Sequence, residues 1–99
     1  MADMLFTVHG HPRDEEVLID ALRAFAASEI HVRIQSIHGN DFSDASTAEK
    51  VSGTLDRLAI ELIAGEQELD RLTAAIRDCR RSYAVRWRAV PVLASGRFA

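Results

Sequence analysis

The order in which strand-like and helix-like hydrophobic patterns follow one another is the feature that most constrains this fold. Four segments have the alternating or short apolar pattern typical of strands: 4–9, 30–35, 57–62 and 85–90. Two segments repeat apolar residues at helical spacing: 17–25 and 69–80. The order βαββαβ predicts a ferredoxin-like α+β domain over residues 1–99, because two right-handed crossovers that share one sheet give this arrangement. We expect an antiparallel four-stranded sheet in the order 4-1-3-2, with two helices on one face.

Local signals mark some of these boundaries. Pro12, followed by Asp14 and two glutamates, is typical of a helix start. Proline suits the first helical turn, and carboxylates favour the positive end of the helix dipole. Gly65 predicts the end of the third strand.

Composition narrows the class of protein. A chain of 99 residues holds one hydrophobic core, and 47% hydrophobic against 27% charged residues is a normal globular balance. The net charge of −3 gives no broad attraction for nucleic acid or for an anionic membrane. Cys79 is the single cysteine, so no internal disulfide forms. The start has no signal-peptide pattern and no apolar run is long enough to insert in a membrane, so we expect a cytoplasmic protein.

A long polar stretch lies at the centre of the chain. Residues 36–53 read SIHGNDFSDASTAEKVSG and show no sustained period. Most connections inside a domain are about 4 to 6 residues long, and much longer ones tend to be binding loops or disorder. We predict an interaction loop over 38–53, with a tolerated disordered insertion as the alternative. The candidate contact residues are His38, Asn40, Asp41, Phe42, Asp44 and Lys50.

The expected topology gathers polar residues at one edge of the sheet. His9 and His11 end the first strand, and the central loop and Cys79 with the two arginines after it lie at the same edge, whereas His31 lies at the opposite end. Imidazole and carboxylate groups bind borderline divalent metals, so one hypothesis is a heavy-metal site. Its candidate ligands are His9, His11, His38, Asp41 and Asp44. The alternative is a polar strand-to-helix turn in which His11 fills a capping position.

The end of the second helix carries a basic pair. Arg80 and Arg81 can hold a phosphate or carboxylate, or can simply stabilise the negative end of the helix dipole. Cys79 falls on the semi-apolar side of that helix, which favours an inert, buried thiol. Trp87 has the parity of the core-facing residues and is expected in the core.

The sheet face that the helices leave open has a mixed character. We expect it to carry Leu5, Thr7, Arg33, Gln35, Ile37, Arg57, Glu61, Arg86, Arg88 and Val90. So many aliphatic residues predict self-association, in which Arg57, Arg86 or Arg88 meets Glu61 of a neighbouring copy. The face lacks the aromatic platform of RNA-binding sheets. No nucleophile–base spacing and no glycine-rich phosphate loop is present, so an enzyme is not expected.

Particular runs resemble a known family. The fold pattern with a long loop between strands two and three resembles the PII signalling superfamily, whose T-loop has this place. The runs AEKVSG (48–53) and YAVRWRAVPVLASGRF (83–98) resemble an uncharacterised PII-like branch, whose genes lie beside heavy-metal efflux pumps of the resistance-nodulation-division type. The resemblance covers most of the chain. It implies a homotrimer with the open sheet faces inside, ligand clefts between subunits, and a membrane efflux pump as a partner.

The chain also departs from the PII pattern. Typical members have a glycine-rich segment before the last strand that helps to hold the phosphates of adenine nucleotides. Here that segment reads RDCRRSY (77–83) and has no glycine, which counts against nucleotide as the ligand. The loop also lacks the tyrosine that some PII proteins modify. The copper-tolerance trimers known as CutA share the architecture, but the loop and C-terminal runs fit them less well.

Two hypotheses follow from these patterns. The first is a trimeric PII-like regulator that senses a metal ion or an anionic metabolite and reports through residues 38–53. The second is a heavy-metal chaperone or buffer, or a CutA-like metal-tolerance trimer, that uses the same histidines without a signalling partner. A purely structural trimer is a third possibility.

Overall fold

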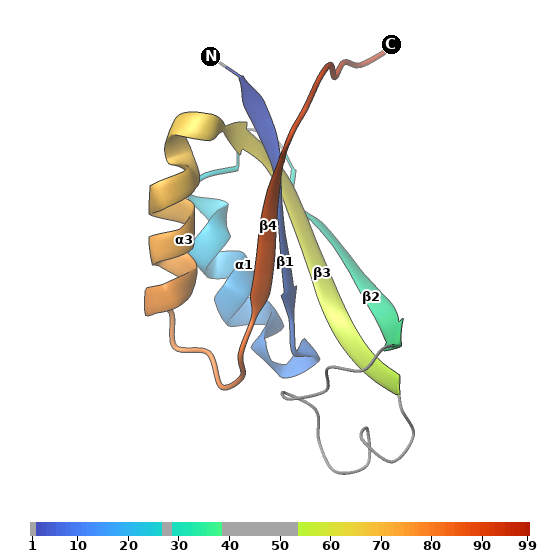
Figure 1. The fold of residues 1–99 in the computed structure, drawn as a ribbon, viewed down its shortest axis with the longest axis vertical. Helices are drawn as coiled ribbons and strands as arrows, with labels where there is room; N and C mark the ends of the chain where they lie inside the picture. Colours follow the sequence, from blue (N-terminus) through green and yellow to red (C-terminus); the bar gives the residue numbers. More distant parts are fainter. Residues whose placement is uncertain (1, 27–28, 39–53) are drawn as a thin grey trace.

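The computed structural model describes residues 2–26, 29–38 and 54–99, and its elements follow the predicted order (Figure 1). The strands are β1 (Asp3–Gly10), β2 (His31–His38), β3 (Thr54–Gly65) and β4 (Arg86–Pro91). The α-helices are α1 (Glu15–Arg23) and α3 (Leu69–Asp78), preceded by the short 3-10 helices η1 (Pro12–Asp14) and η2 (Glu66–Glu68). Pro12 opens η1, which confirms the predicted helix start.

The four strands form one sheet in the order β2-β3-β1-β4, and each neighbouring pair is antiparallel. This is the predicted order 4-1-3-2, counted from the other edge. β3 and β1 lie in the centre, and β2 and β4 form the edges.

Both α-helices lie against the same face of the sheet (Figure 1). From the strands, Phe6, Val8 and Leu62 point into the core, and Leu18 of α1 and Leu72 of α3 meet them there. Each of these side chains has at most 1% of its surface exposed. Burying one such side chain stabilises the fold by about 1.5–3 kcal/mol, so this helix-covered face provides most of the hydrophobic stabilisation.

The hairpin of β2 and β3 is longer than the sequence pattern predicted. Ser36, Ile37 and His38 belong to β2 and β3 begins at Thr54, so the strand pattern over 30–35 and 57–62 stopped short of the observed strand ends, and the predicted interaction loop over 38–53 starts at the last residue of β2. The main-chain ladder continues where the side-chain pattern fades, because backbone groups pair regardless of side-chain polarity. At its end, His38 is paired with Thr54.

The interpretation of Trp87 as a core residue was only half right. Its ring stacks on Phe6 with a centroid separation of 5.8 Å, as the parity required. However, 48% of Trp87 is exposed, because β4 is an edge strand and has no further strand beside it. The C-terminal tail after β4 also exposes Leu93 and Phe98 completely.

No helix within the described ranges is long and apolar enough to cross a membrane.

Candidate functional site

The face of the sheet opposite the helices forms a groove of about 600 Å³. All ten residues that the sequence predicted for this face line it: Leu5, Thr7, Arg33, Gln35, Ile37, Arg57, Glu61, Arg86, Arg88 and Val90. His9 and the edge residue Trp87 complete the lining. Alternation along four strands therefore places polar and apolar side chains together on one open surface.

An ion pair crosses this groove from β2 to β3. A guanidinium nitrogen of Arg33 lies 2.8 Å from a carboxylate oxygen of Glu61. The two residues are diagonal neighbours, because Arg33 is opposite Ala59 and His31 is opposite Glu61. Half of the Arg33 side chain is exposed, so the pair is worth about 0.2–1 kcal/mol.

Arg57 is buried in the same face, with only 4% of its surface exposed. Its guanidinium donates a hydrogen bond to the main-chain carbonyl of Asp56 at 2.7 Å. Thr7 is also buried. The floor of the groove is therefore polar although it is largely withdrawn from water.

His9 is the last residue but one of β1, as the sequence predicted, and its side chain lines this groove. Its pKa is lowered below the ordinary 6.5, first by burial and then by the positive charges of Arg88 and Arg33. A hydrogen bond with Gln35 and the charge of Glu61 act in the opposite direction. The Nδ1 atom of His9 is buried and has no hydrogen-bond partner among the described groups.

His11 caps the start of η1, which confirms the alternative interpretation of this residue. Its Nδ1 accepts a hydrogen bond from the backbone N–H of Arg13 at 3.1 Å. Its ring also stacks on Tyr83, with centroids 3.8 Å apart and planes 10° apart. One of the two imidazole nitrogens is therefore already occupied.

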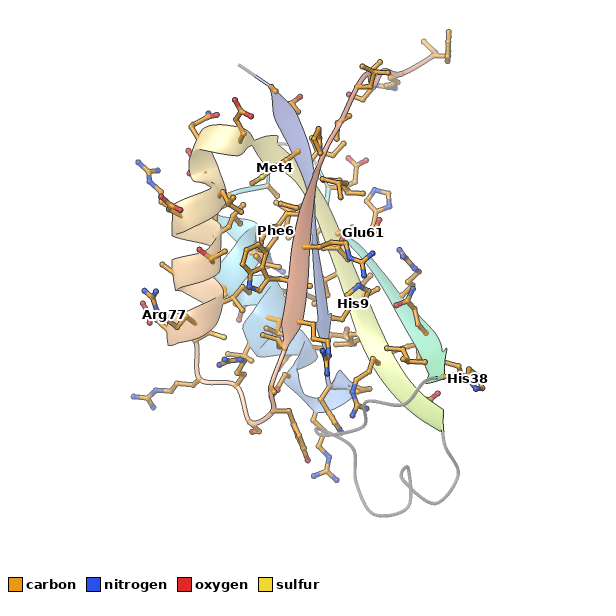
Figure 2. The ribbon with its side chains drawn as sticks, in the orientation of Figure 1. Met4, Phe6, His9, His38, Glu61 and Arg77 are labelled. Carbon is orange, nitrogen blue, oxygen red and sulfur yellow. The ribbon has the colours of Figure 1, made fainter. Side chains whose placement is uncertain are left out.

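The structure does not bring His9 and His38 together. Both His9 and Arg33 are opposite Ala59, and His38 follows Arg33 by five residues along β2. At about 3.4 Å per residue, His38 lies about 17 Å further along the sheet. Figure 2 shows His9 well apart from His38, which lies at the end of β2.

The remaining members of the proposed metal and partner sets lie outside the described residues: Asn40, Asp41, Phe42, Asp44 and Lys50. Within the ranges that the structure describes, no group of three or more histidine, cysteine, aspartate or glutamate side chains is arranged to hold a metal ion. His31 is paired with Glu29 at 3.2 Å, and it lies far along β2 from His38, as predicted.

The connection from α3 to β4 is held by Asp14, which the sequence marks only as a helix-start signal. The buried Asp14 carboxylate accepts hydrogen bonds from the backbone N–H groups of Ser82 and Tyr83, at 2.9 and 3.0 Å. These residues are 68 and 69 positions away in the sequence, so no local pattern could have revealed the contact. Asp14 thus ties the start of the first helical segment to the connection that carries the basic pair.

The two arginines of the basic pair differ in solvent exposure. Arg80 is exposed, whereas Arg81 is half-buried and its Nε has no hydrogen-bond partner among the described groups. The backbone N–H of Arg81 donates to the Cys79 carbonyl at 3.0 Å, which forms a tight turn after α3.

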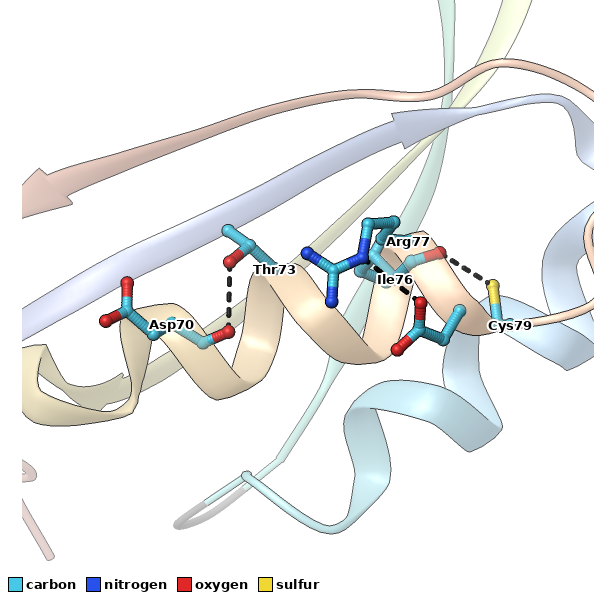
Figure 3. A network of polar contacts seen from close by, with 6 residues as sticks. Asp70, Thr73, Ile76, Arg77 and Cys79 are labelled. Atoms are coloured by element: carbon cyan, nitrogen blue, oxygen red, sulfur yellow. Dashed lines mark hydrogen bonds and ion pairs between the residues drawn. The ribbon is translucent and has the colours of Figure 1, made fainter.

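Cys79 packs against the core and its thiol is engaged by the helix. Figure 3 shows the Sγ–H group donating to the Ile76 carbonyl, at 3.2 Å, and Arg77 paired with Asp78 immediately before it. The thiol contacts the hydrophobic cluster of the domain. This agrees with the interpretation of Cys79 as a packing residue.

Comparison with solved structures defines the class of fold. The GlnK–ATP complex of Bacillus subtilis has a TM-score of 0.61 at 12% identity, over 90% of this chain and 82% of that chain. A putative PII-like signalling protein from Thermus thermophilus has a TM-score of 0.59 at 18% identity, over 93% and 91%. The chain therefore has a PII-like fold.

The family is narrower than the fold. The chain belongs to the DUF3240 family, described as a protein of unknown function, whose profile matches residues 3–99. A DUF3240 protein from Shewanella baltica has a TM-score of 0.77 at 11% identity, over 100% of this chain and 99% of that chain. No curated protein sequence matches this chain.

Proposed function

We propose that this chain is a non-enzymatic PII-like regulatory protein that assembles as a homotrimer, senses a small effector and reports through residues 38–53. The observation that supports the proposal most is the agreement of nearly the whole chain with PII-like signalling proteins in fold. A resemblance of fold alone does not carry function, so the proposal also depends on the surfaces described above.

Assembly through the open sheet face is supported by what that face exposes. The helices cover only the other side, and Val90 and Arg33 on the open face remain substantially exposed. In a homotrimer, Glu61 of one copy meets Arg57, Arg86 or Arg88 of another. Leu93 and Phe98 of the tail are exposed in the single chain, and contact with a neighbouring copy in the same assembly would bury them.

An adenine nucleotide is a poor candidate for the effector. The GlnK complex contains ATP. In this chain, the backbone N–H groups of Ser82 and Tyr83 already bind the Asp14 carboxylate. A phosphate that approached these two groups would meet a negative charge, so Arg80 and Arg81 are left as the anion-contacting candidates of this connection.

The partner is proposed from the resemblance to the branch that accompanies heavy-metal efflux pumps. The loop between β2 and β3 starts at the end of the longest hairpin, at His38 and Thr54. We therefore assign the contact with a membrane pump to His38 and the loop residues after it. A metal ion remains the second candidate effector, with His9 and His11 as its separately placed ligands.

The test is a thermal-shift panel on chelator-stripped protein, with light scattering to give the mass of the assembly. The panel contains zinc, copper, nickel, cobalt and cadmium ions, then ATP, ADP, AMP and bicarbonate, because a ligand that binds only the folded state raises the melting temperature. The proposal predicts three times the chain mass and a shift with an anion or a metal. A monomer at micromolar concentration would overturn the trimer. A metal shift that disappears in the His9→Ala, His11→Ala double variant, without any pump contact, would establish a metal buffer instead.

A further inference from the structure

The edge strand β2 leaves large apolar side chains exposed on the side of the sheet that the helices occupy. No residue of β2 is buried. Val32 is 40% exposed and Ile34 is 59% exposed, although they are opposite Ile60 and Leu58, which belong to the core. The helices therefore cover the centre of the sheet and leave this edge without apolar cover.

An open pocket lies where the end of α1 meets the start of β2. Its volume is about 320 Å³, and it is lined by Ile19, Arg23, Ala26, Ile30 and Val32. An apolar cavity of about 150 Å³ is large enough to bind benzene, so this pocket has room for the ring of a phenylalanine side chain.

The segment after β4 carries large apolar side chains that have no cover in the single chain. Leu93 and Phe98 are completely exposed. The backbone N–H of Val92 still donates to the Asp3 carbonyl at 3.1 Å, but a Cβ atom at Gly96 would meet no described atom within 4 Å. Figure 1 shows this tail running away from both helices. Exposed apolar groups of this size indicate a contact with another surface.

The strand register places the tail and the pocket near the same end of the sheet, at opposite edges. Pro91, the last residue of β4, is opposite Met4 of β1. The first residue of β2, His31, shares a row with Thr7 of β1, because both are opposite the same residue of β3. These rows are three residues apart, or about 10 Å. Residues 92–98 span up to about 23 Å when extended, which is more than this offset.

The shape of a trimer brings these two edges together. Three sheets whose open faces turn toward a common axis, with the strands along that axis, form a triangular prism. At each corner the β4 edge of one copy lies beside the β2 edge of the next, and rotation keeps the same ends of the sheets level.

We infer that the tail of each copy packs onto the neighbouring copy, where Leu93 and Phe98 cover the pocket between α1 and β2. The inference rests on the proposed homotrimer and names the surfaces that close it. The contact is head-to-tail, because a different patch of each copy takes part, and the prism closes after three such contacts.

The charges at this place agree with the contact. Arg97 is the single charged side chain of residues 92–99. The exposed carboxylates of Asp20 and Glu29 directly adjoin residues of the pocket, and each has one weak cationic neighbour in its own chain. A guanidinium that arrives with the tail therefore meets negative charge. On its own copy the tail would first have to cross three strand spacings, or about 14 Å of sheet.

The first test is a disulfide between the tail and the pocket. In a Cys79→Ser background, whose hydroxyl can still donate to the Ile76 carbonyl, Ala99→Cys is combined with Arg23→Cys. The matched control combines Ala99→Cys with Arg77→Cys, because Arg77 is an equally exposed arginine on α3. Circular dichroism establishes that each variant is folded.

After mild oxidation we expect the double variant at 23 and 99 to give covalent dimers and trimers on a denaturing, non-reducing gel, and the control to remain a monomer. A monomer with an internal disulfide would show that the tail folds onto its own chain and would overturn the inference. Equal cross-linking in the control would mean random collision and would overturn it as well.

The second test measures association by light scattering over a dilution series. The Leu93→Ser, Phe98→Ser double variant should dissociate at a protein concentration at least about tenfold higher than the unmodified chain, since burial of one large apolar side chain is worth a factor of about ten or more. Ala94→Ser, in the same tail, is the control and should leave the midpoint unchanged. An unchanged midpoint in the double variant would contradict the contact.

The proposed function and the inference fail in different ways. An unmodified chain that is a monomer at micromolar concentration would overturn the homotrimer and this contact together. A trimer that keeps its dissociation midpoint without Leu93 and Phe98, and that gives no disulfide between tail and pocket, would refute only the inference.

Discussion

Replacement of Asp14 by asparagine tests the contact that ties the start of η1 to the connection between α3 and β4. The asparagine carbonyl can still accept one hydrogen bond, but its NH₂ group then faces the second backbone N–H. One charge-assisted hydrogen bond is lost and one partly buried donor is left without an acceptor. Each of these effects costs about 1–3 kcal/mol, so we expect a total loss of about 2–6 kcal/mol.

This loss is large for a domain of this size. At about 0.05–0.15 kcal/mol per residue, a chain of 99 residues has a free energy of unfolding of about 5–15 kcal/mol. A loss of about 3 kcal/mol corresponds to a fall in melting temperature of roughly 12–24 °C. The measurement is urea unfolding at one fixed protein concentration, with amide hydrogen exchange at Ser82 and Tyr83 to show that protection is lost there first.

Asp20→Asn is the matched control for Asp14→Asn. The Asp20 carboxylate is exposed and lies 3.8 Å from Arg23, so its replacement should cost less than about 0.5 kcal/mol. If the two variants unfold at the same urea concentration, the Asp14 carboxylate does not fix the connection, and the reasoning is refuted.

Three further predictions concern the two faces of the sheet. Phe6→Ala should cost about 3–5 kcal/mol in urea unfolding, because Phe6 is fully buried and stacked on Trp87; a loss below about 1 kcal/mol would mean that the core closes around the cavity. The stability of the unmodified chain relative to His9→Gln should be constant above neutral pH and fall as the pH drops through 6.5, since the lowered pKa of His9 makes the unfolded chain bind the proton first; a difference independent of pH between 5 and 8 would contradict this. A double-mutant cycle of Arg33→Gln and Glu61→Gln should give a coupling energy of about 0.2–1 kcal/mol that decreases with salt. A coupling energy of zero at low salt would show that this ion pair does not stabilise the fold.

The arrangement of the sheet could be predicted because hydrophobic alternation reports which face a side chain occupies. Every residue assigned to the open face, from Leu5 to Val90, lines the groove there. The ends of the strands were harder to predict from the sequence. Ser36–His38 extend β2 through main-chain pairing, which the periodicity of the side chains does not reveal.

The candidate site could be predicted only in part, because it depends on contacts between distant residues. His9 and His11 are two positions apart, yet Gly10 ends the strand between them and the chain turns into η1, so that one histidine lines the groove and the other caps a helix. The Cβ of any other residue at position 10 would lie 2.7 Å from the Leu18 Cδ1 atom, which explains why a glycine stands at this turn. The Asp14 contact joins segments 68 residues apart and has no local signature.

The pairing of His38 with Thr54 has a practical consequence for the architecture of this protein. Because the hairpin ladder is closed at that pair, the fifteen residues 39–53 can be replaced by a short turn between two fixed points of the sheet. Exchanging them for a two-residue Asn-Gly turn would lower the loop-closure cost by about 1.8 kcal/mol. Such a shortened chain should keep the sheet, its groove and its core, so it would test whether the proposed reporting through residues 38–53 can be separated from the proposed binding of an effector.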